Sequence, residues 1–287
     1  MIDLDAYLAR IGLSASATLA QVHRAHSTSI PFENLDPQRG LAVSLELEDL
    51  ERKLVAERRG GYCFEQNLLL KAALEALGAE VDLLLARVRS GAAPGAVRPR
   101  SHLVLRVHSE GTSWHADVGF GLGTLLEPLP FGPGEAHEQS GWRFRVVEDG
   151  PELVLQAAEG DRWVDQYGLL DHPVPPIDVE TINWWTSTHP RSPFVTGLMV
   201  SRQDADGTRI SLSDWGELAL TERTPARTSV TPVAREALPE LLAARFALGG
   251  FALGAGGRLV RGDEPGESPA VDDAAEVARL RGHGRLR

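Results

Sequence analysis

The hydrophobic pattern of the chain changes its period near residue 80, and this change restricts the possible folds more than any other feature. Before residue 80, apolar side chains recur every three or four positions, and two such runs end at Gly12 and Gly78, as helices often do. After it, short segments alternate or are rich in β-branched residues, and Gly, Pro and Ser separate them. These segments are residues 80–89, 102–108, 112–118, 142–147 and 153–157. Helices followed by antiparallel strands predict an α+β protein.

The last third of the chain mixes both patterns. Residues 172–178 are rich in Pro, and we expect a loop there; an aromatic stretch with Ser, Thr and Pro follows at 183–194. The elements expected after it are strands at 197–201 and 208–212 and helices at 239–246 and 271–281.

Charge, hydrophobicity and cysteine content indicate which partners the protein can have and where it works in the cell. The 287 residues include 29 Lys and Arg and 40 Asp and Glu, and the net charge of −11 argues against a broad nucleic-acid or anionic membrane surface. No window approaches the roughly 18 uninterrupted apolar residues of a membrane span. The first ten residues lack the basic and apolar regions of a secretory signal. One cysteine excludes an internal disulfide and cysteine-rich metal sites, so we expect a cytoplasmic protein without a bound metal.

Three motifs that would each identify an enzyme class are missing from the sequence. They are the phosphate loop G-x-x-x-x-G-K-[ST], the zinc motif H-E-x-x-H and the nucleophile motif G-x-S-x-G. Residues 119–123 (GFGLG) lack the spacing of a dinucleotide fingerprint, so they are interpreted as a Gly-rich turn that leaves a strand.

The lone cysteine stands at the predicted start of a helix. Cys63 comes two residues after the pair Gly60 and Gly61 and opens the Leu-rich run before Gly78. At a helix start, unpaired backbone N–H groups and the positive end of the helix dipole stabilise a thiolate, which is the reactive form of cysteine. The two glycines permit a sharp turn and the close approach of a substrate. The pattern fits a nucleophile, and a buried cysteine that packs as a small hydrophobic side chain is the alternative.

A predicted β-hairpin brings a histidine and a carboxylate together. If Ser109 pairs with Thr112 around a two-residue loop, His102 and Asp117 lie on one face, one diagonal step apart and within side-chain reach. A histidine oriented by a carboxylate is the usual general base beside a thiolate nucleophile. The pattern alone also permits two other histidines, His108 and His115, and exposed strand histidines beside an unrelated aspartate are the alternative.

Three blocks of residues closely resemble the arylamine N-acetyltransferases. The blocks are Arg59–Asn67 (RGGYCFEQN), Ser101–Leu103 (SHL) and Asp117–Gly121 (DVGFG), with 39 residues from cysteine to histidine and 15 from histidine to aspartate. Further similar stretches are Ile30–Leu35 (IPFENL), residues 187–190 (STHP) and residues 192–194 (SPF). The resemblance runs in order from about residue 5 to about residue 220.

The resemblance implies a fold of three parts around a triad core like that of cysteine proteases and transglutaminases. The parts are an N-terminal helical bundle over residues 1–79, a central antiparallel β-barrel over 80–190 and a C-terminal α/β lid over 191–287. The bundle would carry the nucleophile, the barrel would carry the histidine and the aspartate, and the lid would end in a Gly- and charge-rich tail. Glu33 and Arg59 would pair near the nucleophile in a structural role.

The resemblance also implies a catalytic triad of Cys63, His102 and Asp117, and it thereby selects His102 over His115. The residues that would contact the substrates are Ser101, Phe120, Gly121 and Phe194. The family more often has threonine at the position of Ser101, and serine keeps the hydroxyl group. The aromatic side chain of Phe194 is explained equally well by core packing.

The implied reaction is transfer of an acetyl group from acetyl-coenzyme A to a small aromatic amine or hydrazine, through an acetylated cysteine. We expect a monomer or homodimer with no nucleic-acid or membrane partner and no metal. The closest alternative is an amide synthase of polyketide pathways, which resembles this family in motif and fold and releases a macrolactam. The same residues would also fit a thiol hydrolase that uses water, or a ligand-binding relative without turnover.

Overall fold

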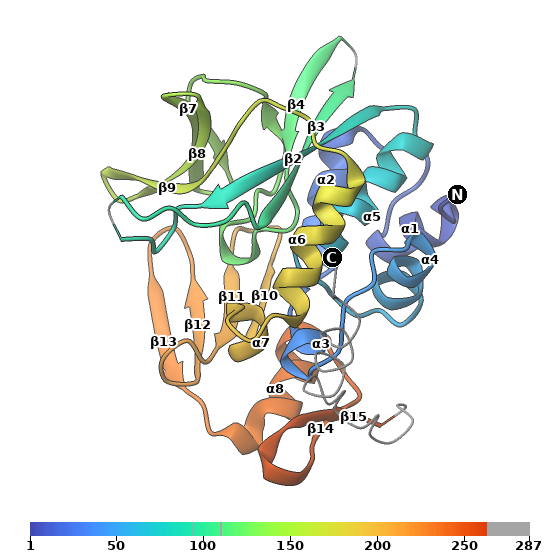
Figure 1. Ribbon diagram of the computed structural model, residues 1–287, viewed down its shortest axis with the longest axis vertical. Helices are drawn as coiled ribbons and strands as arrows, with labels where there is room; N and C mark the ends of the chain where they lie inside the picture. Colours follow the sequence, from blue (N-terminus) through green and yellow to red (C-terminus); the bar gives the residue numbers. More distant parts are fainter. Residues whose placement is uncertain (94, 110, 263–287) are drawn as a thin grey trace, which may run out of the picture.

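The computed structural model describes residues 1–93, 95–109 and 111–262, and Figure 1 shows three parts. N-terminal helices lie on one side, a curled sheet of eight strands lies beside them, and a sheet of five strands lies below it in this view. The expected layout of a helical bundle, an antiparallel barrel and an α/β lid is confirmed. The helix predicted at 271–281 lies outside the described residues.

The N-terminal helices form at apolar runs, and side chains cap the starts of α1 and α2. They are α1 (Leu4–Ile11), α2 (Leu19–Ser29), α3 (Leu35–Gln38), α4 (Leu47–Leu50), its π-helical continuation η1 (Glu51–Ala56) and α5 (Cys63–Ala76). The Asp3 side chain accepts a hydrogen bond from the Ala6 N–H at 3.0 Å, and Gly12 ends α1 with a φ of 75°. Gly78, with a φ of 93°, follows α5. Both predicted helix ends are confirmed.

The eight-stranded sheet is antiparallel throughout and curls into a nearly closed barrel. Its strands are β2 (Glu80–Val88), β3 (His102–Ser109), β4 (Thr112–Ala116), β5 (Leu129–Pro130), β6 (His137–Gln139), β7 (Trp142–Asp149), β8 (Glu152–Glu159) and β9 (Arg162–Leu169). Their order is β5-β4-β3-β2-β9-β8-β7-β6. On one face of β3, Leu103 and Leu105 pack into the core shared with α5, and on the other face Val104 packs inside the barrel with Phe144 and Tyr167. β3 therefore lies between the bundle and the barrel interior.

The hairpin between β3 and β4 has the predicted register. Ser109 pairs with Thr112, and the pairing continues without a shift to Leu105 and Ala116. Asp117 follows β4 directly, and His102 is the first residue of β3, so both side chains reach the same end of the barrel interior.

The five-stranded sheet has one apolar and one polar face. Its order is β1 (Phe32–Glu33), β10 (Met199–Gln203), β11 (Arg209–Ser213), β12 (Ala219–Arg223) and β13 (Thr228–Pro232). The apolar face packs on α8 (Leu238–Phe246) through residues such as Val200 and Leu212. The polar face carries buried Ser201, Gln203 and Arg209. The hairpin of β14 (Phe251–Leu253) and β15 (Leu259–Arg261) completes this part.

The Pro-rich segment is shorter than the sequence indicated, and the prediction of a loop through residue 178 is wrong at its end. The helix α6 (Pro176–Thr188) begins with proline, which is tolerated at the first helical position because its missing N–H has no partner there. A short helix, α7 (Pro193–Thr196), follows. The division into 1–79, 80–190 and 191–287 stays a prediction; β1 comes from the first of these segments and pairs with β10 from the third. Within the described part of the chain, no helix has both the length and the apolar character needed to cross a membrane.

Candidate active site

Cys63 is the first residue of α5 and lies at the junction of the three parts. Glu65 fixes this helix start, because its Oε2 accepts a hydrogen bond from the Tyr62 N–H at 3.0 Å. The cysteine is 3% exposed, and its Sγ lies 3.8 Å from the carbonyl oxygen of Ser101, at the start of β3. As the first residue of the helix, Cys63 has a backbone N–H with no partner inside the helix, as a site for a developing negative charge requires.

Gly119 lets the loop after β4 cross directly over the cysteine. A Cβ at this position would lie 2.5 Å from the Cα of Cys63 and 3.1 Å from its Cβ. Only glycine permits so close an approach of the two backbones. This close approach holds the Asp117–Gly121 segment against the N-terminus of α5.

His102 and Asp117 form a buried pair beside the cysteine. The Nε2 of His102 lies 2.7 Å from Oδ2 of Asp117, and both residues are at most 2% exposed. Burial alone lowers the pKa of His102, but the Asp117 carboxylate and the Cys63 side chain more than compensate and raise it to about 10. Burial raises the pKa of Asp117, but His102 and the hydrogen-bond donors outweigh burial and hold the pKa of this carboxyl well below its usual range. Both shifts favour a charged imidazole paired with the Asp117 carboxylate.

Asn67 orients the carboxylate, and the sequence patterns assigned it no role. Its Nδ2 donates to Oδ1 of Asp117 at 3.0 Å and to the Leu103 carbonyl at 2.7 Å, while its Oδ1 accepts from the Val118 N–H at 3.0 Å. The Gly119 N–H also donates to Oδ1 of Asp117, at 2.9 Å. One signal was present in the sequence: Asn67 lies four residues after Cys63, which puts both on one face of a helix.

Three other histidines, two of them buried, hold different positions. The Nε2 of His115 is hydrogen-bonded to the Tyr167 hydroxyl at 2.8 Å, and burial lowers the pKa of His115 to about 4. The Nδ1 of His23 donates to a backbone carbonyl, and its Nε2 accepts from the Asp117 N–H at 3.1 Å, so this ring is neutral and supports the aspartate backbone. His108 bonds Asp82 at 3.0 Å, away from the cysteine. The structure therefore places His102 next to the Asp117 carboxylate.

The residues predicted to contact the substrates form two groups, one beside His102 and Cys63 and one on α7. Phe120 is half-buried and its ring centroid lies 4.9 Å from that of His102, edge to face. Gly121, with a φ of 70°, begins the single turn η2 (Gly121–Gly123) that follows Phe120. Ser101 contributes its carbonyl near the sulfur of Cys63. Phe194 belongs to the other group: it lies on α7 and packs on the rings of Tyr62 and Phe32, with centroids 5.4 and 6.2 Å away.

A buried cluster of charged side chains lies next to the start of α5. The predicted pairing of Glu33 with Arg59 is confirmed, because Nη2 of Arg59 lies 2.7 Å from Oε1 of Glu33; the same Nη2 lies 2.7 Å from Oδ1 of Asp36. Lys53 joins Asp36 to Glu65, with both distances 2.6 Å. Burial, opposed by Lys53, raises the pKa of Glu65 to about 7. The cluster ties together α3, η1 and the residues around the cysteine.

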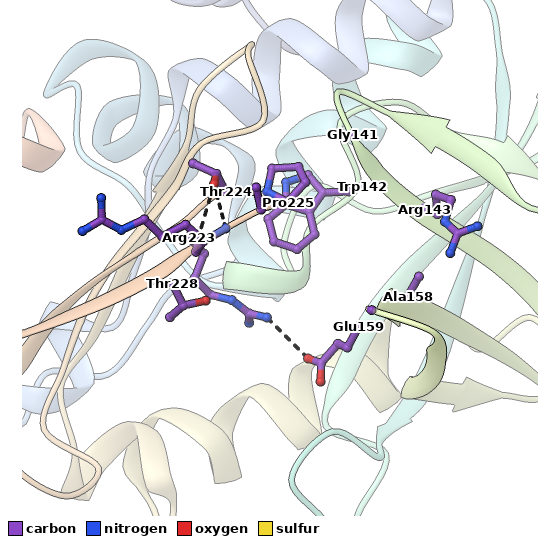
Figure 2. A pocket seen from close by; sticks show the side chains of 12 residues that line it. Gly141, Trp142, Arg143, Ala158, Glu159, Arg223, Thr224, Pro225 and Thr228 are labelled. Carbon is purple, nitrogen blue, oxygen red and sulfur yellow. Dashed lines mark hydrogen bonds and ion pairs between the residues drawn. The ribbon is translucent and has the colours of Figure 1, made fainter.

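A pocket of about 400 Å³ lies between β7–β8 and the β12–β13 hairpin, and Figure 2 shows the side chains that line it. Its walls include Trp142, Arg143 and Thr228, and an ion pair between Arg223 and Glu159 crosses it at 3.4 Å. None of the predicted site residues lines this pocket. It is therefore separate from the cysteine site.

Known acetyltransferases are similar to this chain over most of its length. A family profile described as N-acetyltransferase matches residues 16–249. The arylamine N-acetyltransferase of Mycolicibacterium smegmatis is 42% identical over 209 residues, which cover 70% of this chain and 76% of that protein. The chain belongs to the arylamine N-acetyltransferase family. The family member of Escherichia coli K12 is 36% identical over 217 residues, covering 74% of this chain and 77% of that protein.

A solved structure shows that the family likeness extends over the fold. The Mycobacterium marinum arylamine N-acetyltransferase in complex with CoA superposes with a TM-score of 0.81 at 36% identity, and the match covers 86% of this chain and 93% of that chain. The Salmonella typhimurium enzyme has a TM-score of 0.80 at 30% identity and covers 98% of this chain and 99% of that one. The protein is therefore an acetyltransferase with the fold of this family.

Proposed function

We propose that the protein transfers an acetyl group from acetyl-CoA to the nitrogen of an aromatic amine or hydrazine, with Cys63 as the group that carries the acetyl. The observation that supports this most directly is the buried His102–Asp117 pair, joined at 2.7 Å, beside a cysteine at a helix start. A protonated imidazole next to a sulfur stabilises the thiolate, which is the nucleophilic form. The CoA complex of the M. marinum relative supports the choice of donor.

In the first half of the reaction, the Cys63 thiolate attacks the thioester carbonyl of acetyl-CoA. The unpaired Cys63 N–H at the start of α5 is placed to stabilise the resulting oxyanion. The carbon–sulfur bond to CoA then breaks, and His102 gives its proton to the departing thiolate. The products are free CoA, acetyl-Cys63 and a neutral His102.

In the second half, the amine attacks the carbonyl of acetyl-Cys63. His102 accepts the proton that the amine nitrogen loses, and the Cys63 thiolate leaves, which restores the starting ion pair. Asp117 keeps the proton of the imidazole on Nε2 and stabilises its charged form. Aromatic amines suit this step because they are neutral and nucleophilic at pH 7, and the half-buried Phe120 ring offers an aromatic surface for their rings.

The same proposal covers the remaining contacts and the setting of the enzyme. Phe120 and Gly121 would line the space for the acyl group and the amine, and Ser101 would contact the pantetheine of acetyl-CoA. Phe194 would border the same space through Tyr62. No metal is required by this chemistry. We propose that the enzyme is cytoplasmic, because a single reactive cysteine works best under reducing conditions. We also propose that it is a monomer or a homodimer.

The test is release of free CoA from acetyl-CoA with and without an aniline, measured with a thiol reagent. Release that depends on the amine, together with formation of acetanilide, supports the proposal. Release without amine would instead indicate a thiol hydrolase. Negligible reaction with acetyl-CoA but rapid acylation by a long-chain thioester would favour the amide synthase.

A further inference from the structure

We infer that Arg209 is a positioning residue for amine specificity, which acts by fixing the η2 turn against the ring of Phe120. The inference rests on the proposed function for its kinetic consequences. Arg209 is the first residue of β11, on the polar face of the five-stranded sheet, and is only 4% exposed. It is far from the triad in sequence, and no motif marks it.

The guanidinium of Arg209 holds the loop on both sides of Gly123. Its Nη1 donates to the Leu122 carbonyl at 2.7 Å, and its Nη2 donates to the Thr124 carbonyl at 3.2 Å. The neighbouring strand adds a third bond, from Nε2 of Gln203 to the Leu125 carbonyl at 3.2 Å. The polar face of the sheet thus fixes three carbonyl groups of one short segment.

Gly123 transmits this position to Phe120. A Cβ on Gly123 would lie 2.5 Å from Cδ1 and 2.8 Å from Cε1 of the Phe120 ring, so the glycine backbone is in direct contact with that ring. The Phe120 ring in turn lies 4.9 Å from His102 and 4.8 Å from Tyr167, measured between centroids. A shift of the η2 turn must therefore move or release the aromatic surface beside the imidazole.

Among the described residues, Arg209 has no carboxylate partner, and its Nε has no hydrogen-bond partner. Burial, with a smaller repulsion from Arg223, lowers the pKa of Arg209 to about 9, so the folded surroundings disfavour its charge. Its guanidinium stacks on Trp142 at 4.2 Å and reaches Phe144 at 5.5 Å. The contacts of this buried guanidinium are with loop carbonyls and aromatic rings, which fits a role in positioning the loop.

The chain offers a matched control for Arg209. Arg223 pairs directly with it across β11 and β12 and also lies over Trp142, at 5.6 Å. Figure 2 shows that Arg223 instead points toward Glu159 in the separate pocket. Arg223→Gln therefore removes a guanidinium from the same sheet face and the same tryptophan without releasing the η2 turn.

The kinetic test separates the two half-reactions in Arg209→Gln, Phe120→Ala and the double variant. Because Arg209 acts through an aromatic contact, Arg209→Gln should raise the amine KM roughly threefold to tenfold. Acetylation of Cys63 by acetyl-CoA should change less than about twofold, and Arg209→Gln should add no further loss in the Phe120→Ala background. Arg223→Gln should match the wild type. Equal loss in both half-reactions, or additive losses in the double variant, would overturn the inference.

Hydrogen exchange of the peptide that spans residues 119–126 provides a readout that needs no activity. Exchange should become faster in Arg209→Gln, should be restored partly by Arg209→Lys, and should stay unchanged in Arg223→Gln. If the wild type shows no amine-dependent turnover, the proposed function fails, and this exchange measurement still decides whether Arg209 fixes the turn. Unchanged exchange in Arg209→Gln would refute the inference whatever the activity.

Discussion

Replacing Asp117 by Asn should disable His102 without disturbing the surrounding fold. Oδ1 of Asp117 accepts from Asn67 and from the Gly119 N–H, so the amide oxygen of the variant must occupy that place. The amide NH₂ then takes the place of Oδ2, which lies 2.7 Å from Nε2 of His102. Because the amide donates there, Nε2 must accept, and the proton of the neutral ring moves to Nδ1. The variant therefore holds the tautomer that cannot take a proton from the cysteine or the amine.

The size of the effect follows from the pKa of His102. With the carboxylate present, the pKa of His102 is raised to about 10, so the charged ring predominates at pH 7.5. Without it, burial still lowers this pKa while the strongest influence that raises it is gone, so a smaller share of the rings is charged. Loss of the ion pair alone should slow alkylation of Cys63 about tenfold, the effect of a pKa change of about one unit. Together with the wrong tautomer, amine acetylation should fall by roughly two to four orders of magnitude.

The assay is the rate of Cys63 alkylation by iodoacetamide across pH 5–9, with single-turnover acetylation measured beside it. Asp82→Asn is the matched control, because it removes a carboxylate that lies 3.0 Å from another histidine of the same sheet, His108. That control should behave like the wild type. Alkylation of Asp117→Asn within about twofold of the wild type at pH 7.5 would show that His102 and Asp117 do not activate the cysteine.

Three further predictions concern other parts of the molecule. Truncating Phe120 to Ala should slow the amine half-reaction roughly threefold to tenfold and leave acetylation of Cys63 nearly unchanged; equal slowing of both, in single-turnover assays, would mean that the ring supports the triad. Gly119→Ala should lower the free energy of unfolding by about 1–3 kcal/mol and abolish most activity, because its Cβ would lie 2.5 Å from a backbone atom of Cys63; wild-type activity with unchanged urea denaturation would contradict this. Burial lowers the pKa of His23 to about 4 and that of His26 to about 3, so the unfolded chain binds more protons below pH 6.5, and the free energy of unfolding should decrease as the pH falls from 6.5 toward 4. His26→Gln should reduce that slope in urea titrations, and a slope equal to that of the wild type would refute the assignment.

Local signals in the sequence predicted much of the site. The glycine after the Leu-rich run ends α5, and the two-residue loop at Ser109 sets the register that puts His102 and Asp117 on one face. These features depend on neighbours in sequence, so periodicity and turn chemistry reveal them. The choice among the candidate histidines came from the family resemblance, because parity alone did not separate them.

Other features depend on contacts between distant segments, which no local pattern encodes. β9 was not predicted; the register of its pairing with β8 passes from Tyr167 to Asp165 and leaves out Gln166, which interrupts the simple alternation expected of a strand. The start of α6 at a proline was also missed. Arg209 and Gly123 acquire their roles only when the five-stranded sheet meets the loop after β4.

Intact-protein and peptide mass spectrometry after incubation with acetyl-CoA tests most directly whether Cys63 carries the acetyl group. We expect one added acetyl group in the wild type, located on Cys63, which disappears when an aniline is added. Cys63→Ala should fold like the wild type, because the smaller side chain leaves only a small cavity, and should acquire no acetyl group. An acetyl group on a histidine or lysine, with amine acetylation retained in Cys63→Ala, would contradict the mechanism.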